Sequence, residues 1–402
     1  MKKTISKILS VALVTSVLSI FTGCNDSVFS SIMQDVPPTE ATINGIINSI
    51  ARYNYNGTEC LFTTASSGLI YKEADGQEHG QWKKLSDLPF ETHSYDYYGN
   101  THRGQQIIKV VSDATNLYLV TVAYKNDIDL GTTIPDSFHI WAAANPSTKE
   151  DWKEIEQNEQ FKLETKIVNK LAETDFNVFS TNELNNSKRE AYVRVGGTIS
   201  NTAAYFKLNG QSAPSSKTIS KATDNGNLNN IDAAVYLGST LHFFDTFAVT
   251  TNNEGTTTTG SVAYYAPINS ANLYYTDGTT STEALSASYP VSSLAYTKGT
   301  LFIGRGDYVS STYSYGGIAK TSVAADGTPN TELEKFTTNA ESQLSSAYII
   351  YTLLVTTPEE TELNTTVYAG MGFRGSGTST AVNYKNIGLW SYYPARKNWN
   401  RE

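Results

Sequence analysis

Apolar and polar residues alternate along this chain in short runs, and polar turns separate one run from the next. The clearest example extends from Val291 to Thr338, where VSSLAYTKG, TLFIGRG, GGIAKTSVAADG and TELEKF have the pattern of four successive strands joined by turns. The same order of runs recurs about six times, at intervals of about 55 to 70 residues. Because one such unit cannot cover its own apolar faces, each unit must stack on its neighbours.

Aligning the strands places these units at 47–85, 106–156, 175–220, 231–287, 291–338 and from Ser346 to the C-terminus. The sequence therefore predicts an all-β fold, a six-bladed β-propeller of four-stranded antiparallel blades over residues 44–402. A seven-bladed propeller is the alternative, with the extra blade drawn from residues 161–176. Residues 154–173 have loose apolar spacing and are predicted as a helical or irregular insertion between blades.

The N-terminus resembles a bacterial lipoprotein signal peptide. Three lysines precede the apolar run Ile8–Phe21, which is too short to span a bilayer, and Thr22-Gly23-Cys24 follows it. The resemblance implies that residues 1–23 are removed and that Cys24 carries the lipid, although Phe21 stands where such signals usually have leucine. An ordinary secretory signal is the alternative. Residues 24–43, with Pro37-Pro38, are predicted as a flexible tether.

Composition independently favours an all-β fold. The chain has 26 Tyr, 15 Phe and 28 Gly against 3 Met, a usage that suits pleated, half-buried surfaces joined by tight turns. Loss of the three leader lysines changes the formal net charge from −9 to −12, which argues against nucleic acid as a partner. Lipidation of Cys24 would leave Cys60 without a disulfide partner, and Cys60 is expected to be a small buried residue.

Three predicted units end in an aromatic strand, a polar turn and a closing tryptophan. This arrangement resembles the Asp-box, or BNR-type, hairpins of sialidase-like propellers. The intact Asp-box motif is absent, and the nearest turns are Ala74-Asp75-Gly76 and Ala325-Asp326-Gly327. The resemblance implies the folding unit and assigns no catalytic residue. The aromatic pairs that carry it are Tyr71 with Trp82, Trp141 with Trp152, and Trp390 with Trp399.

The longest predicted loops join second and third strands, and in a propeller these loops share one face with the crossovers between blades. They are Tyr124–Asp136, Ala248–Gly260, Gly304–Gly316 and Gly372–Asn386. Arginines and tyrosines lie at or beside these loops, where a guanidinium fork would suit a carboxylate, a sulfate or an acidic sugar. The predicted ligand-binding residues are Arg103, Arg305, Arg374, Tyr308 and Tyr384, with Arg194 as a weaker fourth arginine. The alternative is that the arginines pair with local acids such as Asp307.

Other chemistry finds little support in the sequence. Arg305-Gly306-Asp307 spells an adhesion tripeptide that also occurs by chance, and Asp127 with Asp129 lacks a following calcium-loop pattern. The histidines show no zinc spacing, so neither a metal nor another cofactor is predicted. The motifs of sialidases and serine hydrolases are absent. The two carboxylates of a glycosidase can come from distant parts of the chain and leave no sequence motif. A glycosidase is therefore still an alternative.

These observations favour a non-catalytic, lipid-anchored propeller that binds a glycan, peptide or protein on its loop-rich face. Its predicted location is the bacterial cell envelope, at the outer membrane or cell surface, with the lipid on Cys24 as its membrane contact. One alternative is a docking or assembly platform in an envelope complex. The other is a degenerate glycoside-active enzyme. Two neighbouring carboxylates at the centre of the loop-rich face would indicate it.

Overall fold

Short strands dominate the chain, in agreement with its alternating pattern. The computed structural model describes residues 43–402 except 66–67, 75–81, 93, 96–101, 128–131, 169–170, 182–188, 198–202, 220–231, 238, 245–248, 253–260, 268–269, 307–315, 337–348, 373–386 and 395–397. The predicted signal peptide, Cys24 and the tether lie outside these residues. Within them, helical structure includes the 3-10 turns η1 (Lys149–Asp151) and η4 (Glu362–Asn364), and no helix of the described residues is long and apolar enough to cross a membrane.

Six four-stranded antiparallel sheets are present in the described part of the chain. The first contains β1 (Ile50–Tyr55), β2 (Thr58–Ala65), β3 (Gly68–Glu73) and β4 (Lys83–Leu85). The second contains β7 (Gln106–Ser112), β8 (Leu117–Asp127), β9 (Thr132–Ala143) and β10 (Lys153–Glu154). The third contains β13 (Phe176–Ser180), β14 (Ala191–Gly196), β15 (Ala203–Asn209) and β16 (Ser212–Ser216).

The remaining sheets complete the chain. The fourth contains β19 (Val249–Asn252), β20 (Ser261–Tyr265), β21 (Asn272–Thr276) and β22 (Ser281–Ser286). The fifth contains β23 (Val291–Thr297), β24 (Thr300–Gly306), β25 (Gly316–Ser322) and β26 (Glu334–Lys335), and the sixth β27 (Ile349–Val355), β28 (Val367–Gly372), β29 (Leu389–Tyr393) and β30 (Asn398–Arg401). Two-stranded sheets are formed by β5 (Ser94–Tyr95) with β6 (His102–Arg103), β11 (Thr165–Val168) with β12 (Leu171–Thr174), and β17 (Ala233–Leu237) with β18 (Thr240–Phe244).

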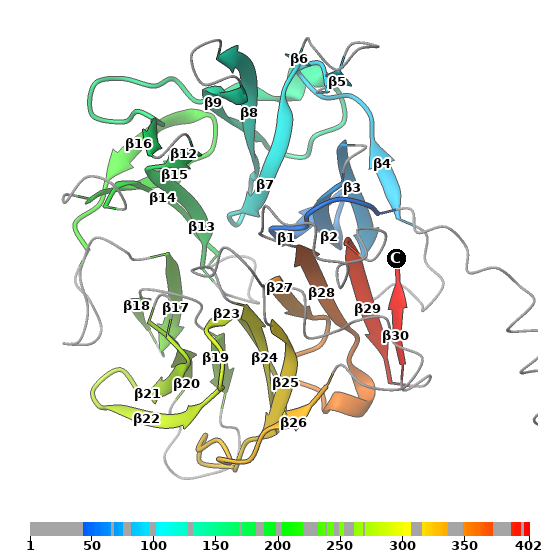
Figure 1. Ribbon diagram of the computed structural model, residues 1–402, viewed down its shortest axis with the longest axis vertical. Coiled ribbons are helices and arrows are strands. Elements are labelled where there is room, and N and C mark those ends of the chain that lie inside the picture. The colour runs from blue at the N-terminus through cyan, green and yellow to red at the C-terminus, as the bar shows by residue number, and fades with distance from the viewer. Residues whose placement is uncertain are drawn as a thin grey trace, which may run out of the picture. The chain divides into compact units, whose positions relative to one another are not determined.

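The leading strands of these sheets surround a common centre (Figure 1). Each contacts the next in the order β1, β7, β13, β17, β19, β23 and β27, and β27 returns to β1. Within each four-stranded sheet the strands are ordered as a meander, so the later strands lie farther out (Figure 1). Radial packing of four-stranded meanders is the architecture of a β-propeller. The predicted all-β fold of four-stranded antiparallel sheets is confirmed.

The predicted fourth unit, at 231–287, is wrong in its strand pairing. Its first two strands form the separate sheet β17–β18, whereas β19 leads the following sheet. β19 lies inside the segment 248–260 that the sequence assigned to a long loop. Local alternation identifies a hairpin, but it does not specify which third strand continues the sheet. The predicted loop at 124–136 is also shorter, because β8 extends to Asp127 and β9 begins at Thr132.

The helical alternative for residues 154–173 is wrong as well. This segment contains the end of β10, an irregular stretch and most of the β11–β12 hairpin. Phe161 and Leu163 are buried in the irregular stretch, where they pack between the second and third sheets. Two apolar anchors without helical spacing explain why the segment gives only a weak periodic pattern.

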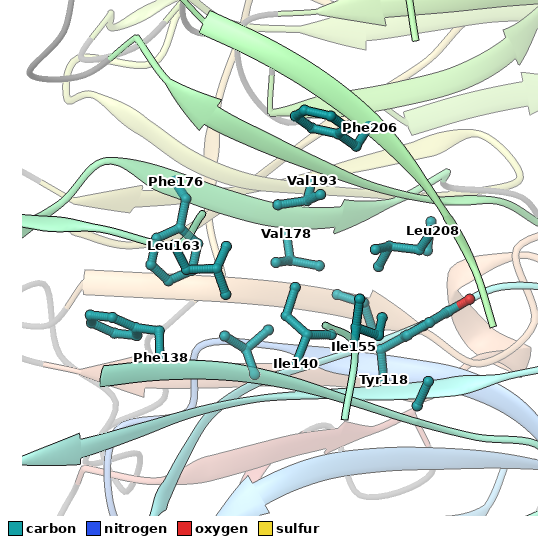
Figure 2. Packing of buried hydrophobic residues seen from close by; sticks show 14 of the residues in the cluster. Tyr118, Phe138, Ile140, Ile155, Leu163, Phe176, Val178, Val193, Phe206 and Leu208 are labelled. Carbon is teal, nitrogen blue, oxygen red and sulfur yellow. The ribbon is translucent and has the colours of Figure 1, made fainter. Parts of the chain in front are cut away.

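Apolar side chains fill the space between neighbouring sheets. Between the second and third sheets, Phe138 and Ile140 of β9 face Phe176 and Val178 of β13 (Figure 2). The rings of Phe138 and Phe176 meet edge to face, with centroids 4.9 Å apart. Because successive side chains of a strand point to opposite faces, alternate residues of one sheet reach two different neighbours. Stacking of the units is therefore the source of the core.

Glycine permits close approach between the fifth and sixth sheets. A Cβ added to Gly304 would lie 2.2 Å from Oγ of Ser293 in its own sheet and 2.9 Å from Cγ2 of Ile350 in the sixth, and one added to Gly306 would lie 2.5 Å from Cγ2 of Ile349. On β28 of the sixth sheet, a Cβ on Gly370 would lie 2.6 Å from the carbonyl oxygen of Ile47. The repeated Gly-x-Gly pattern of β24 and β28 is thus a packing device.

Side chains of the first and last sheets join the two ends of the fold. Buried Lys72 of β3 donates a hydrogen bond to the hydroxyl of Tyr393 at 3.0 Å and lies 3.7 Å from a carboxylate oxygen of Glu402. The indole nitrogen of Trp82 donates to the same carboxylate at 2.6 Å. The Ile43 amide also donates to the Glu402 carbonyl at 3.2 Å. These contacts close the arrangement of sheets between its first and last strands.

Candidate functional site

A cluster of polar side chains lies near the N-terminal ends of the leading strands β7, β13 and β17. Lys109 of β7 donates from Nζ to Oδ1 of Asn177 on β13 at 2.7 Å, so it bridges two leading strands. Lys109 follows a β-bulge, because the register of β7 with β8 shifts between Ile107 and Lys109. A bulge changes the direction of the following side chain. This places a lysine between two sheets otherwise packed through apolar residues.

An ion pair forms the second half of the cluster. Arg194 of β14 lies directly opposite Asn177 in the ladder. Its Nε donates to Oδ1 of Asp232 at 2.8 Å, and its Nη2 donates to Oδ2 at 3.4 Å. The Arg194 side chain is 5% exposed and that of Asp232 is 23% exposed. A two-pronged contact of this kind fixes the orientation of the carboxylate as well as its position.

The cluster lowers the pKa of its lysine. Burial is the main cause and takes the pKa of Lys109 to about 8, with Arg194 adding to the decrease and Asp232 opposing it. An ammonium group with a pKa near the working pH can both give and take a proton. Perturbed groups of this kind concentrate at functional sites.

A second carboxyl group occupies the same strand position as Asp232. Asp232 immediately precedes β17, and Asp175 immediately precedes β13. Asp175 is buried, and its carbonyl accepts a hydrogen bond from the amide of Gly196. The carbonyl of that same glycine accepts a hydrogen bond from Nη1 of Arg194. Arg194 is therefore bound to the carboxylate of Asp232 and is connected, through the backbone of Gly196, to the backbone carbonyl of Asp175. We name Lys109, Asp175, Asn177, Arg194 and Asp232 the axial cluster.

The structure places the sequence-predicted residues unevenly. Arg194, the weakest of the predicted arginines, belongs to the axial cluster. Arg103 is in β6, and nothing is described of its side chain. Arg374, Tyr308 and Tyr384 lie outside the described residues, as does Cys24. Cys60 of β2 is buried, as expected.

Arg305 lies at the end of β24 and is largely buried. Its guanidinium carbon is 5.4 Å from the ring centroid of Tyr289, and Nη1 donates to the carbonyl of Ala287 at 3.1 Å. Its Nε is buried without a hydrogen-bond partner in the described part of the chain. Burial lowers the pKa of Arg305, and Tyr289 opposes the decrease. The stacked pair offers a cation beside a partly exposed aromatic ring.

Sequence reasoning missed Lys109, Asp175, Asn177 and Asp232. One signal was available for Lys109, because it interrupts the apolar strand QIIKVVS. The aspartates gave no such signal, since each is a common residue at the edge of a predicted strand. Only the packing of β13 beside β7 and β17 brings these residues together.

No family model matches the chain, and no curated protein matches it. Solved structures with a similar fold are glycoside hydrolases. A GH43_1 enzyme from Xanthomonas citri complexed with xylose is 11% identical, with a TM-score of 0.34 over 75% of this chain and 95% of that one. A GH43 β-xylosidase/α-arabinofuranosidase from a compost microbial metagenome is 14% identical, with a TM-score of 0.34 over 74% and 98%. A GH130 structure, described with glycoside hydrolases that target β-1,2 mannosidic linkages, is 11% identical, with a TM-score of 0.33 over 88% and 86%.

These comparisons correct the predicted function. The sequence favoured a non-catalytic binding protein, with an assembly platform as one alternative, but the similar structures are enzymes of glycosidic bonds. At these identities and TM-scores the likeness transfers no residue role and no substrate to this chain. The resemblance to Asp-box hairpins stays a prediction.

Proposed function

We propose that the protein is a glycoside-active enzyme whose reacting groups belong to the axial cluster. The observation that carries the proposal is that Asp175 and Asp232 each stand immediately before a leading strand, with Arg194 bound to the Asp232 carboxylate and, through Gly196, to the Asp175 backbone. Glycosidases cleave their bond with two carboxyl groups, one giving a proton to the departing oxygen and the other acting as nucleophile or base.

The environments of the two aspartates suggest how these roles divide. Asp232 is held by the Arg194 guanidinium and is partly exposed, so we assign it to attack on the anomeric carbon or to activation of a water molecule. Asp175 is the more buried of the two, and we assign it to proton donation. Asn177 and Lys109 then supply hydrogen bonds to the sugar, and Lys109 adds positive charge near the acids.

The predicted arginines and tyrosines enter the proposal as substrate contacts. Arg305 stacks on Tyr289, so the pair supplies a cation and an aromatic face. The Ala287 carbonyl accepts a hydrogen bond from Arg305 and fixes its position. Arg374, Tyr308 and Tyr384 belong to loops that the sequence predicts on one face, and Arg103 precedes the first strand of the second sheet. A sugar ring stacks on aromatic faces and accepts hydrogen bonds from guanidinium groups, which suits this set.

The blade number and the cellular address belong to the same proposal. The leading-strand order includes β17 between β13 and β19, which supports a ring of seven positions with a two-stranded unit at the fourth.

Lipidation of Cys24 holds this ring at the membrane of the bacterial envelope, where extracellular glycans are its substrates. Mass spectrometry of detergent-extracted protein measures the lipid, and Cys24→Ala is expected to abolish it and release the protein into the soluble fraction.

Aryl glycosides provide the direct test of the enzymatic proposal. The full chain is assayed against p-nitrophenyl xyloside, arabinofuranoside, mannoside and galactoside, which represent the sugars named for the similar glycoside hydrolases. Turnover of at least one is expected, and Asp232→Asn or Asp175→Asn should lower kcat/KM by about 10²- to 10⁴-fold. Glu164→Gln, an exposed carboxylate paired with Lys162, is the matched control and should leave kcat/KM unchanged.

Two results would contradict the proposal. One is the absence of turnover for every glycoside of the panel and for a mixture of envelope polysaccharides. The other is turnover that Asp175→Asn and Asp232→Asn leave intact while both variants keep the parent's thermal melting temperature.

A further inference from the structure

A serine, a histidine and a glutamate form a connected row on the outer part of the second sheet. Oγ of Ser137 lies 3.0 Å from Nε2 of His139, and Nδ1 of His139 lies 2.5 Å from Oε1 of Glu154. An ionised carboxylate can only accept a hydrogen bond, so Nδ1 of the neutral ring carries the proton. Nε2 then presents its lone pair to the serine hydroxyl. This is the order of groups in a nucleophile, general base and orienting acid.

The strand geometry explains why the three groups meet. Ser137 and His139 are two positions apart on β9, so their side chains project from the same face of the sheet. Glu154 belongs to β10 and pairs with Trp141, the next residue on that face of β9. The register of β8 with β9 shifts between Ala123 and Tyr124, which leaves a bulge immediately before Ser137. Bulges recur beside active sites because they redirect the adjoining side chain.

The row is accessible to a small substrate. The side chain of His139 is 22% exposed and that of Glu154 is 40% exposed. Trp141 forms one wall, with its ring centroid 6.5 Å from that of His139. Its indole nitrogen donates to Oε1 of Gln105 at 3.1 Å, and its ring packs against Phe90 at 5.6 Å. A fixed aromatic wall beside the histidine suits an acyl group or an apolar leaving group.

A backbone donor lies next to the serine. The carbonyl of Phe138 accepts a hydrogen bond from Nε2 of Gln157 at 2.7 Å, so it faces the outer edge of β9. In a strand, the amide and the carbonyl of one residue point to the same edge. β10 pairs with β9 only at Trp141 and Ala142 in the described part of the chain, so this edge lies beyond the ladder at Phe138. The amide of the residue after a nucleophile is a common oxyanion donor.

From this geometry we propose that Ser137, His139 and Glu154 are an acyl-transfer site that hydrolyses small esters, separate from the axial cluster. Oγ of Ser137 bonds to the carbonyl carbon while its proton passes to Nε2 of His139. The carbonyl π electrons move to oxygen, which the Phe138 amide stabilises. The ester C–O bond then breaks, and the departing oxygen takes the proton from Nε2. Water repeats the sequence on the acyl-serine, releasing a carboxylic acid and restoring Ser137. Glu154 is a positioning residue that orients the ring and stabilises its cation.

Covalent labelling and ester turnover test the site on the full chain. The parent is incubated with an alkyl fluorophosphonate and digested, and the peptide carrying the adduct is identified by mass spectrometry. Hydrolysis of p-nitrophenyl acetate is followed in parallel. Labelling of Ser137 is expected, with a loss of ester turnover of at least about 10³-fold in Ser137→Ala and His139→Gln. His242→Gln, a half-buried histidine of β18, is the matched control and should label and turn over as the parent does.

Glu154→Gln separates a positioning role from a structural one. Loss of its charge should lower kcat while KM stays near the parent value, because the ring is no longer held in the orientation and tautomer that accept the serine proton. The labelling experiment uses only the parent protein. It therefore still tests the site if Ser137→Ala fails to fold. An unlabelled Ser137 in the parent, or ester turnover unchanged in a folded Ser137→Ala, overturns the proposal and reduces the row to a structural hydrogen-bond network.

Discussion

Two junctions between neighbouring leading strands are filled by opposite means. Where β23 and β24 meet β27, glycine and neutral hydroxyl groups allow close approach, and the hydroxyls of Ser292 and Ser293 both donate to the Ile350 carbonyl, at 2.7 and 3.1 Å. Around β7, β13 and β17 the corresponding space holds the charged axial cluster. Burying charge costs free energy unless each group is paired, so a charged junction is an expensive way to pack two sheets.

The contrast indicates which junction serves only packing. A fold that can close its strands with Gly-x-Gly has no structural need for two aspartates, a lysine and an arginine elsewhere. Local departures from the most stable packing tend to mark functional sites. We therefore expect the reacting groups in the axial cluster. The β23–β27 junction is expected to serve packing only.

The largest effect on stability is expected from breaking the axial ion pair. Asp232→Ala leaves the Arg194 guanidinium, 4% exposed as a residue, without its carboxylate and should lower the free energy of unfolding by about 3 kcal/mol. Urea denaturation measures the change. Glu164→Ala is the control, because its contact with Lys162 has the same 2.8 Å length but the two side chains are 64% and 58% exposed; a loss below about 0.5 kcal/mol is expected there.

A double variant sharpens this result. Arg194→Met with Asp232→Leu removes both charges and should recover much of the loss, since an uncompensated buried charge is the cost. If Asp232→Ala is as stable as the parent, the Arg194–Asp232 pair is not electrostatically coupled. The charged junction would then not differ in this respect from the neutral β23–β27 junction.

A smaller effect is expected at the neutral junction. Gly304→Ala places a Cβ 2.2 Å from Oγ of Ser293 and 2.9 Å from Cγ2 of Ile350, so both must move. Overpacking of this kind should cost about 1 to 3 kcal/mol in the free energy of unfolding, measured by urea denaturation. Adding Ser293→Ala removes the nearer atom and should restore part of the stability. An equal loss in the single and double variants would show that the serine does not set the spacing.

The sequence was sufficient for one junction and insufficient for the other. The run VSSLAYTKG and the glycines of TLFIGRG are a strand pair whose local alternation determines its own partner, and β23 pairs with β24 as predicted. Lys109 belongs to the second sheet, whereas Asp175 and Asp232 precede β13 and β17. Local sequence patterns do not report how separate sheets pack against one another. The same limit explains the fourth unit, where the hairpin β17–β18 has the alternation of a leading pair without its continuation.

The outer row of the second sheet was within reach of sequence reasoning. Ser137 and His139 alternate on one strand, and Glu154 follows the turn after it, so a hairpin model places all three on one face. The segment was interpreted through Trp141 and Trp152 as a packing hairpin. Trp152 is indeed buried, whereas Trp141 borders the histidine.

The smallest effect, and the most specific to the charged junction, is a change in the pH dependence of stability. Burial holds the pKa of Lys109 at about 8 in the native state, against about 10.4 in an unfolded chain. Between these values the unfolded chain binds more protons, so this lysine makes the free energy of unfolding rise with pH. Below about pH 8 both states are protonated and its contribution to the slope vanishes.

Lys109→Met should therefore flatten the rise in stability between about pH 8 and pH 10 relative to the parent. Lys162→Met, at an exposed lysine, should leave that slope unchanged. The comparison is made by urea denaturation at matched ionic strength, and the difference between parent and variant cancels the tyrosines that titrate above this range. Parallel curves for the parent and Lys109→Met would mean that Lys109 stays charged in the native state. The proton-transfer capacity assigned to the axial cluster would then rest on its two aspartates alone.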